Sequence, residues 1–295
     1  MLKKIIVMFC LAICSISTAF AADSNARIFQ ISDGVRFSES VYPYDGGLLI
    51  SNFGSENFNP RDDENKGYIS YYKNGEMITI IPPDGSLHCP TAMAVKDGYL
   101  FVCDKTDVKV FNLNNLNEEY QIVTFPTDDK VINAMALKNN TLYITMTNPG
   151  RVYRLDVSEP ANMTAKTPEK WLDIPGANGI AIRDNTMYVV SIPTDYATIT
   201  PKNVIYRIKN INRPIVEKFD DIAALYDGVD ISNDGKKLYV SDWKSAALIE
   251  VDIRTKEHKI IYQKNGIGPA DLAIENNIIY LPDLLNSKIL VIVTD

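Results

Sequence analysis

Six positions, about 45 residues apart along the chain, carry side chains whose oxygen atoms could act together in one site. Each lies two residues before the apolar residue that opens a recurring phrase, usually apolar-Ala-apolar. The six residues are Glu39, Thr91, Asn133, Asn178, Asp227 and Ala270. Four of the six are a carboxylate or a carboxamide, whereas acidic residues and asparagine make up only about one residue in five of the whole chain. This enrichment indicates a shared task.

Two carboxylates and two amides form a set of hard oxygen ligands. Such a set suits Ca²⁺ best, admits Mg²⁺ or Mn²⁺, and accepts Zn²⁺ less comfortably. The alternative is that the same side chains cap turns and line a water-filled channel. The pattern favours a site for one divalent cation over this alternative.

These positions can meet only if the chain repeats one structural unit around an axis, and the repeats provide such a unit. They read ESVYPYDGGLLISN (39–52), PTAMAVKDGYLFVCD (90–104), NAMALKNNTLYITM (133–146), NGIAIRDNTMYVVS (178–191), DGVDISNDGKKLYVSD (227–242) and ADLAIENNIIYLPD (270–283). Six β-meanders at this spacing predict an all-β fold, a six-bladed β-propeller. In a propeller the six positions form a ring at one mouth of the central channel.

Each copy is expected to begin with an inner strand and an aromatic-rich second strand, joined by a hairpin turn such as Asp97-Gly98 or Asn139-Asn140. Third strands are expected at 67–72, 108–112, 151–156, 203–208, 247–252 and 288–293. Fourth strands are expected at 77–81, 119–124, 169–172, 215–219 and 256–262. The last copy lacks a fourth strand, so residues 27–32 are expected to complete it and close the ring.

Three insertions are longer than hairpin loops need to be. They span residues 54–66, 160–167 and 193–202. Loops on a propeller carry much of its variation, so we expect some of these insertions to overhang the mouth.

The first 21 residues have the pattern of a secretory signal peptide. Lys3 and Lys4 precede an apolar stretch, and Ala19-Phe20-Ala21 forms a cleavage site with small residues at both ends. The apolar stretch is too short for a membrane span. We therefore expect residues 22–295 to be a single propeller domain, periplasmic or secreted, with no membrane attachment after cleavage.

Charge and cysteine content narrow the class of protein. The chain has a formal net charge of −7, which disfavours binding to nucleic acid and to anionic membranes and allows a cation or a neutral small molecule. Cys89 and Cys103 remain after signal removal and are expected at the same end of one blade. In an oxidising compartment they could form a disulfide or stay reduced, while zinc binding by two cysteines alone is disfavoured.

The wording of the repeats resembles the family of the senescence marker protein (regucalcin) and gluconolactonase, which are six-bladed propellers. The resemblance covers nearly the whole mature chain, most clearly at the blade starts. It implies that Glu39, Asn178 in Ala177-Asn178-Gly179 and Asp227 in Tyr226-Asp227-Gly228 hold a divalent metal. It also implies that Asn133 touches the substrate.

The sequence departs from this family at two blade starts. The third blade reads Val131-Ile132-Asn133 where the family has an arginine before this asparagine, and the first reads Glu39-Ser40-Val41 in place of Glu-Gly-Pro. These changes put specificity for sugar lactones in doubt. Copies two, five and six also resemble NHL-type repeats, many of which only bind partners.

Several further residues are candidates for the mouth. Thr91, Asp271 and His88 are expected to contact a ligand, although Asp271 could equally serve a turn. His258 is expected on the solvated surface, and Trp171 and Trp243 are expected to pack between blades. Because the chain has only these two histidines, a Ser-His-Asp or Cys-His catalytic arrangement is disfavoured. No nucleotide-binding motif is present.

Two functions follow as hypotheses. The first is an exported, monomeric hydrolase in which a metal polarises a lactone or ester carbonyl and Asp227 is the general base. The second is a non-catalytic propeller that binds a small ligand or a protein. A lyase resembling the streptogramin-opening propellers is a third, weaker possibility, because those depend on a mouth histidine and only His88 could supply it.

Overall fold

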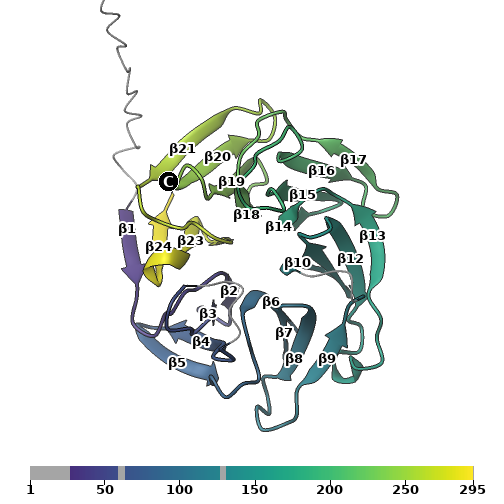
Figure 1. The fold of residues 1–295 in the computed structure, drawn as a ribbon, viewed down its shortest axis with the longest axis vertical. Helices are drawn as coiled ribbons and strands as arrows, with labels where there is room; N and C mark the ends of the chain where they lie inside the picture. Colours follow the sequence, from purple (N-terminus) through teal and green to yellow (C-terminus); the bar gives the residue numbers. More distant parts are fainter. Residues whose placement is uncertain (1–26, 59–63, 127–130, 295) are drawn as a thin grey trace, which may run out of the picture.

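The computed structural model describes residues 27–58, 64–126 and 131–294. The signal peptide predicted at residues 1–21 lies outside this part of the chain. Six four-stranded antiparallel sheets stand around a central axis like the blades of a propeller (Figure 1). The predicted fold is therefore confirmed. No helix within the described residues is both long and apolar enough to cross a membrane.

Each blade is a meander whose strands run outward from the axis in sequence order. The first three blades are β2 (Val41–Tyr44), β3 (Gly47–Asn52), β4 (Tyr68–Lys73), β5 (Glu76–Ile81); β6 (Pro90–Lys96), β7 (Tyr99–Asp104), β8 (Asp107–Asn112), β9 (Gln121–Thr124); and β10 (Ile132–Lys138), β11 (Thr141–Met146), β12 (Arg151–Asp156), β13 (Glu169–Asp173). The fourth and fifth are β14 (Ala177–Arg183), β15 (Thr186–Ser191), β16 (Ile205–Lys209), β17 (Ile215–Lys218); and β18 (Tyr226–Ile231), β19 (Lys237–Asp242), β20 (Ala247–Asp252), β21 (His258–Gln263).

The sixth blade joins the two ends of the chain. It consists of β22 (Ala273–Glu275), β23 (Ile278–Asp283), β24 (Lys288–Val293) and the amino-terminal β1 (Arg27–Ile31). Strand β1 pairs antiparallel with β24 from Arg27 opposite Val293 to Ile31 opposite Ile289. Figure 1 shows this first strand beside the last ones. The predicted closure is thus confirmed: β1 covers the edge of β24 and forms the outer strand of the sixth blade.

Local turn chemistry sets the register of the inner hairpins. Asp97, Asn139 and Asp184 open the turns between first and second strands with φ values of 49°, 54° and 52°. This left-handed conformation is tolerated best by glycine, asparagine and aspartate, and it is what the two-residue hairpin turns require. The apolar positions of each strand therefore fall on both faces of the blade, where neighbouring blades cover them.

The second strands form the core between blades. Leu100, Leu142 and Ile144 are fully buried, as is most of each second strand. Burial of each such side chain contributes about 1.5–3 kcal/mol. The core is distributed around the ring and leaves the axis itself to polar side chains.

Two of the three insertions contribute to the mouth at one end of the ring. The described residues of the first, 54–58 and 64–66, and residues 193–202 lie between second and third strands, and Phe58 and Thr194 line the cavity. Residues 59–63 of the first insertion lie outside the described residues. Residues 160–167 link β12 to β13, which places them at the opposite end. They include a short 3₁₀ helix, Pro160–Asn162.

Candidate active site at the propeller mouth

Irregular pairing at the start of the inner strands positions the predicted ring residues. The register between first and second strands shifts between Pro90 and Met93, Ile132 and Met135, Ala177 and Ile180, and Tyr226 and Val229. Each shift encloses one ring residue, respectively Thr91, Asn133, Asn178 and Asp227. A bulge leaves residues unpaired and changes the direction of a side chain. The bulges thus free these side chains from the ladder.

A hydroxyl group from the second strand holds the backbone next to the ring residue in three blades. The backbone N–H groups of Ser40, Ala134 and Gly228 donate to Ser51 Oγ at 3.0 Å, Thr145 Oγ1 at 2.9 Å and Ser241 Oγ at 2.7 Å. All three hydroxyl side chains are buried. They satisfy the amide that follows the ring residue, and a buried unpaired amide would be costly.

Hydrogen bonds between neighbouring blades fix the ring residues relative to one another. Thr91 Oγ1 donates to the Asn133 carbonyl at 2.7 Å, and the Asp271 amide donates to the Glu39 carbonyl at 3.1 Å. Ser241 Oγ also reaches across, to the Ala270 carbonyl at 2.9 Å. The mouth is therefore a cross-linked rim, which suits a site that must hold its groups in fixed positions.

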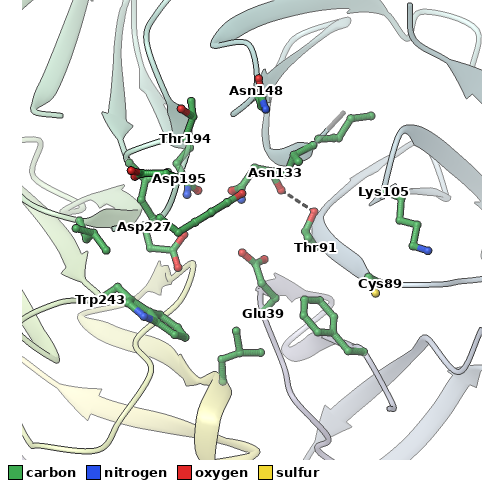
Figure 2. Close-up of a pocket in the computed structure, with 18 of the residues that line it drawn as sticks. Glu39, Cys89, Thr91, Lys105, Asn133, Asn148, Thr194, Asp195, Asp227 and Trp243 are labelled. Carbon is green, nitrogen blue, oxygen red and sulfur yellow. Dashed lines mark hydrogen bonds between the residues drawn. The ribbon is translucent and has the colours of Figure 1, made fainter. Parts of the chain in front are cut away.

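Glu39, Asn133, Asn178 and Asp227 line the inner end of a single cavity of about 560 Å³. Figure 2 shows the side chains of Glu39, Asn133 and Asp227 converging from three different blades. All four residues are buried. The structure thus brings together the four ring residues that the sequence singled out.

Three oxygen atoms of this group are buried without a partner. Glu39 Oε2, Asn133 Oδ1 and Asn178 Oδ1 accept no hydrogen bond from the described residues. Native proteins satisfy most buried polar atoms, so orphaned oxygens at one place point to a bound cation, water or ligand group. The side chain of Asn178 also donates a hydrogen bond to Asp227.

The carboxyl groups of the mouth are strongly perturbed. Burial raises the pKa of Asp227 to about 7. Burial, followed by the charges of Asp227 and Asp271, raises the pKa of Glu39 well above its usual value. The pKa of Asp271 is raised to about 7 by burial, with the Asp227 charge acting in the same direction. Three acids that disfavour each other's ionisation form a natural place for a positive charge.

Protein kept in chelator is expected to lose stability as the pH rises from about 4 to about 7. The folded state keeps protons on Glu39, Asp227 and Asp271 that the unfolded chain has already released, so it binds more protons in this window. The slope is about 1.4 kcal/mol per pH unit for each carboxyl that titrates. Urea unfolding in chelator at four pH values measures it.

Exposed carboxylates act in the opposite sense, but only at lower pH. Asp156, Asp195 and Asp234 have a pKa of about 2, held down first by hydrogen bonds from Lys166, Thr198 and Ser232. They are ionised throughout the window and do not hide the effect. A stability that rises steadily from pH 4 to 7 in chelator would contradict the assignment of the mouth carboxyls.

The donor set fits a hard divalent cation only if amides take part. Within the described ranges, no three His, Cys, Asp or Glu side chains lie close enough to hold a metal by themselves. Glu39 and Asp227 supply two carboxylates, and the amide oxygens of Asn133 and Asn178 supply the neutral donors. Such all-oxygen sets are the kind that Ca²⁺ accepts.

The other predicted mouth residues take different places. Thr91 lines the cavity. Asp271 lies outside the lining but interacts with Asp227 and Glu39, and its Oδ2 accepts a hydrogen bond from Ser40 Oγ at 3.1 Å. His88 is also outside the lining, and its backbone N–H donates to Asp104. The surface position expected for His258 is wrong, because its Nε2 lies 2.9 Å from a buried Asp220 carboxylate.

Cys89 and Cys103 are both buried and are not joined to each other. Cys103 lies opposite the bulge between Pro90 and Met93. It is one residue before the end of its second strand, as Ser51, Thr145 and Ser241 are in other blades. Its thiol interacts with the Thr91 side chain, and burial raises its pKa well above the usual value. The thiol therefore faces the bulge of its own blade, whereas Cys89 lines the cavity. Of the two states expected, the structure has the reduced one.

Aromatic residues of the mouth were not foreseen. Trp243, which was expected to pack between blades, lines the cavity together with Phe53, Phe58 and Tyr196. Trp171 packs against Tyr143 with ring centroids 5.0 Å apart, as expected for a structural residue. No arginine is found among the described residues that line the cavity, and Lys105 is the basic residue there. Among the described residues, no other blade supplies to the cavity an arginine like the one that the resembled family carries in its third blade.

Comparison with solved structures finds the same fold in proteins of several kinds. A gluconolactonase from Xanthomonas campestris superposes with a TM-score of 0.68 at 12% identity over 92% of this chain and 91% of that chain. A carbohydrate-active enzyme of family AA12 from Trichoderma reesei superposes with a TM-score of 0.63 at 11% identity, over 93% of this chain and 97% of that chain. A catalytically inactive virginiamycin B lyase from Staphylococcus aureus, solved with quinupristin, superposes with a TM-score of 0.59 at 11% identity. The superposition covers 92% of this chain and 100% of that chain.

Sequence comparison gives no corresponding result. No protein-family model matches the chain, and no curated protein matches it. At 10–14% identity the likeness to the solved structures shows a shared six-bladed fold.

Proposed function

We propose that the chain is an exported, cation-dependent hydrolase that opens a lactone or ester at the mouth of the propeller. The observation that carries this proposal is the group of orphaned buried oxygens of Glu39, Asn133 and Asn178 at the inner end of one cavity. A site of this kind is built to receive a ligand that the polypeptide itself does not provide.

Glu39, Asn178 and Asp227 would hold the cation, with Asn133 beside them. When bound, the cation would supply Lewis acidity, polarising a substrate carbonyl and lowering the pKa of a water molecule. It would also relieve the mutual repulsion of Glu39 and Asp227, whose burial is otherwise uncompensated. The fit rests on donor chemistry and on the unpaired oxygens.

Asp227 is suited to take a proton from an attacking water. Its carboxylate lines the cavity, and the amide of Asn178 donates to it and fixes its orientation. Asn133 lies across the mouth and would orient the substrate through its amide, while Thr91 holds the Asn133 backbone at 2.7 Å.

The comparisons support this proposal at the level of the fold alone. Enzymes that include a gluconolactonase share the six-bladed architecture over more than nine-tenths of both chains. The substrate and the cation are inferred from this chain's own mouth residues.

A second candidate is a propeller that binds a ligand or a protein without reacting with it. Two observations favour it: the cavity has no lining arginine in the described part of the chain, and the third-blade phrase departs from that of the resembled family. A hydrolase and a binding module differ in whether a bound cation is required.

Added Ca²⁺ is expected to raise the melting temperature of chelator-treated protein by about 5 °C or more. A cation present at 100 times its Kd contributes about 2.7 kcal/mol, and each kcal/mol shifts Tm by about 2–4 °C in a domain of this size. Differential scanning fluorimetry with Ca²⁺, Mg²⁺, Mn²⁺ and Zn²⁺ measures the shift. A parallel assay on a lactone and ester panel tests hydrolysis.

A matched pair of substitutions locates the cation. Glu39→Gln should abolish most of the shift, whereas Glu169→Gln should leave it intact, because Glu169 is exposed on β13 and pairs with Arg154 at 2.8 Å. No shift with any of the four cations, together with no hydrolysis, would favour the binding module. A full shift in Glu39→Gln would remove Glu39 from the site.

A further inference from the structure

The cavity above the oxygen-bearing ring is walled mostly by apolar side chains. Phe53, Phe58, Ile192, Leu225, Trp243 and Leu284 line it. They come from the loops and strand ends of four blades, so the apolar character belongs to the whole mouth. Burial of a ligand's apolar surface against such a wall contributes about 25 cal/mol per Å².

Trp243 and Phe58 form a continuous aromatic surface on one side of the mouth. The ring centroids of Phe58 and Trp243 lie 6.4 Å apart, and those of Phe37 and Phe58 lie 5.6 Å apart. Figure 2 shows Trp243 close to Asp227 and Glu39. When the reactive group of a ligand lies at the ring, the neighbouring part of the ligand can therefore contact this aromatic surface.

The position of Trp243 is set by a glycine. A Cβ atom on Gly268 would lie 2.7 Å from Cη2 of Trp243 and 2.7 Å from Cγ of Leu285. The indole therefore packs directly on the Gly268 backbone, where no larger residue fits. A fixed aromatic platform of this kind loses little conformational entropy when a ligand binds.

Several polar side chains also line the cavity, among them Lys105, Asn148 and Asp195, but none of them belongs to the aromatic surface of Phe58 and Trp243. A sugar lactone carries a hydroxyl on nearly every carbon, and each one buried without a partner costs about 1–3 kcal/mol. Thr91 Oγ1 already donates to the Asn133 carbonyl. The remaining threonines of the lining, Thr106 and Thr194, lie in loops of the outer mouth.

The charge of the site disfavours an anionic ligand. Glu39 and Asp227 both line the cavity, and Asp271 lies beside them, with its backbone N–H donating to the Glu39 carbonyl at 3.1 Å. Lys105 is the one basic residue among the described residues that line the cavity, and Figure 2 shows it on the other side of the mouth from Trp243. A neutral molecule meets no such repulsion.

Building on the hydrolase function proposed above, we propose that the substrate is a neutral lactone or ester with a bulky apolar group, alkyl or aryl. The apolar group lies on the wall formed by Phe58 and Trp243, and the carbonyl faces Asp227. Water adds to the carbonyl, the ring or ester C–O bond breaks, and the proton from water passes by way of Asp227 to the departing alkoxide.

A series of γ-lactones with alkyl chains of increasing length tests the substrate class on protein loaded with Ca²⁺. The value of kcat/KM should rise about fourfold for each of the first few methylene groups, which is the effect of about 0.8 kcal/mol per buried methylene. Glucono-1,5-lactone should be the poorest substrate. Trp243→Ala should lower kcat/KM for the long-chain lactone at least tenfold and alter the unsubstituted lactone less than threefold.

A matched control and a binding assay separate this proposal from the hydrolase itself. Trp171→Ala removes a tryptophan that packs on Tyr143 in the third blade, and it should change neither value. In a Trp171→Phe background, Trp243 is the only tryptophan, since the chain has two. Long-chain γ-lactams, which resist hydrolysis, should then change its fluorescence on binding, and Gly268→Ala should weaken that binding.

Each outcome decides one of the two proposals. Lactam binding without hydrolysis of any lactone would keep the apolar ligand class and overturn the hydrolase. Hydrolysis of glucono-1,5-lactone as fast as that of the long-chain lactones would overturn the apolar preference and leave the hydrolase. Neither binding nor hydrolysis would overturn both.

Discussion

Asp227→Asn is expected to lower kcat/KM for the best lactone or ester by about 10²–10⁴-fold, the usual contribution of a general base. Asparagine keeps the shape of the side chain but takes up no proton. The loss should fall on kcat, because the amide oxygen still occupies the position of a carboxylate oxygen in the mouth. Steady-state kinetics across pH measure it, and the acid limb of the wild-type profile should disappear with the carboxylate.

The control for this prediction is a second aspartate near the mouth. Asp195→Asn changes an exposed carboxylate whose Oδ1 accepts hydrogen bonds from the backbone of Ala197 and Thr198, which the amide oxygen of asparagine can replace. Its pKa of about 2 makes it a poor base. It should alter kcat/KM by no more than a few-fold. A wild-type rate in Asp227→Asn would exclude Asp227 from the chemistry.

The fold could be predicted from sequence because its determinants are local and repeated. Asp97, Asn139 and Asp184 select hairpin turns that need a positive φ, and the observed angles near 50° are the ones these residues tolerate. Ring closure by residues 27–32 followed from counting strands, because a three-stranded last copy leaves an edge that the chain must cover. These inferences needed no knowledge of distant contacts.

The ring of polar residues could also be predicted from the sequence, but the hydroxyl groups that hold its backbone in place could not. Ser51, Thr145 and Ser241 stand out as hydroxyl residues late in otherwise apolar second strands, and this was a usable signal. Its meaning depends on the hydrogen bonds with the backbone of Ser40, Ala134 and Gly228, the last two of which lie in bulges. A repeat pattern predicts which strands pair, whereas the bulge shifts that pairing by a residue.

The character of the cavity depends on loops, whose conformation a repeat pattern does not predict. Trp243 follows a second strand and could equally have packed between blades. Its place in the mouth is fixed by the bare backbone of Gly268, from the connection to the next blade. Similarly, the carboxylate of Asp220 pairs with the imidazole of His258, which is largely removed from solvent, although the two residues lie in different segments. Such contacts are tertiary, and the sequence around one residue does not indicate which distant residue it will contact.

Gly228→Ala is expected to destabilise the protein by about 1–3 kcal/mol, the usual cost of overpacking, and to weaken Ca²⁺ binding at least tenfold. A Cβ atom on Gly228 would lie 2.7 Å from the Asp271 Cα, and one on Gly179 would lie 2.5 Å from the Asp227 carbonyl oxygen. Both neighbours are backbone atoms, so β18 must move away from β22. Urea unfolding in chelator and Ca²⁺ titration calorimetry measure the two effects.

The matched substitution is Gly75→Ala, in the turn between β4 and β5. Gly75 has a φ of 85°, and a Cβ atom added to it would meet no described atom within 4 Å, so alanine there costs backbone strain of about 1–2 kcal/mol without displacing a neighbour. It should lower stability and leave the Kd for Ca²⁺ unchanged. Comparing the two substitutions therefore separates the effect of backbone strain from the effect of the spacing between the blades. Unaltered Ca²⁺ affinity in Gly228→Ala would mean that close backbone approach between the fifth and sixth blades is not what sets the distance of Asp227 from Glu39.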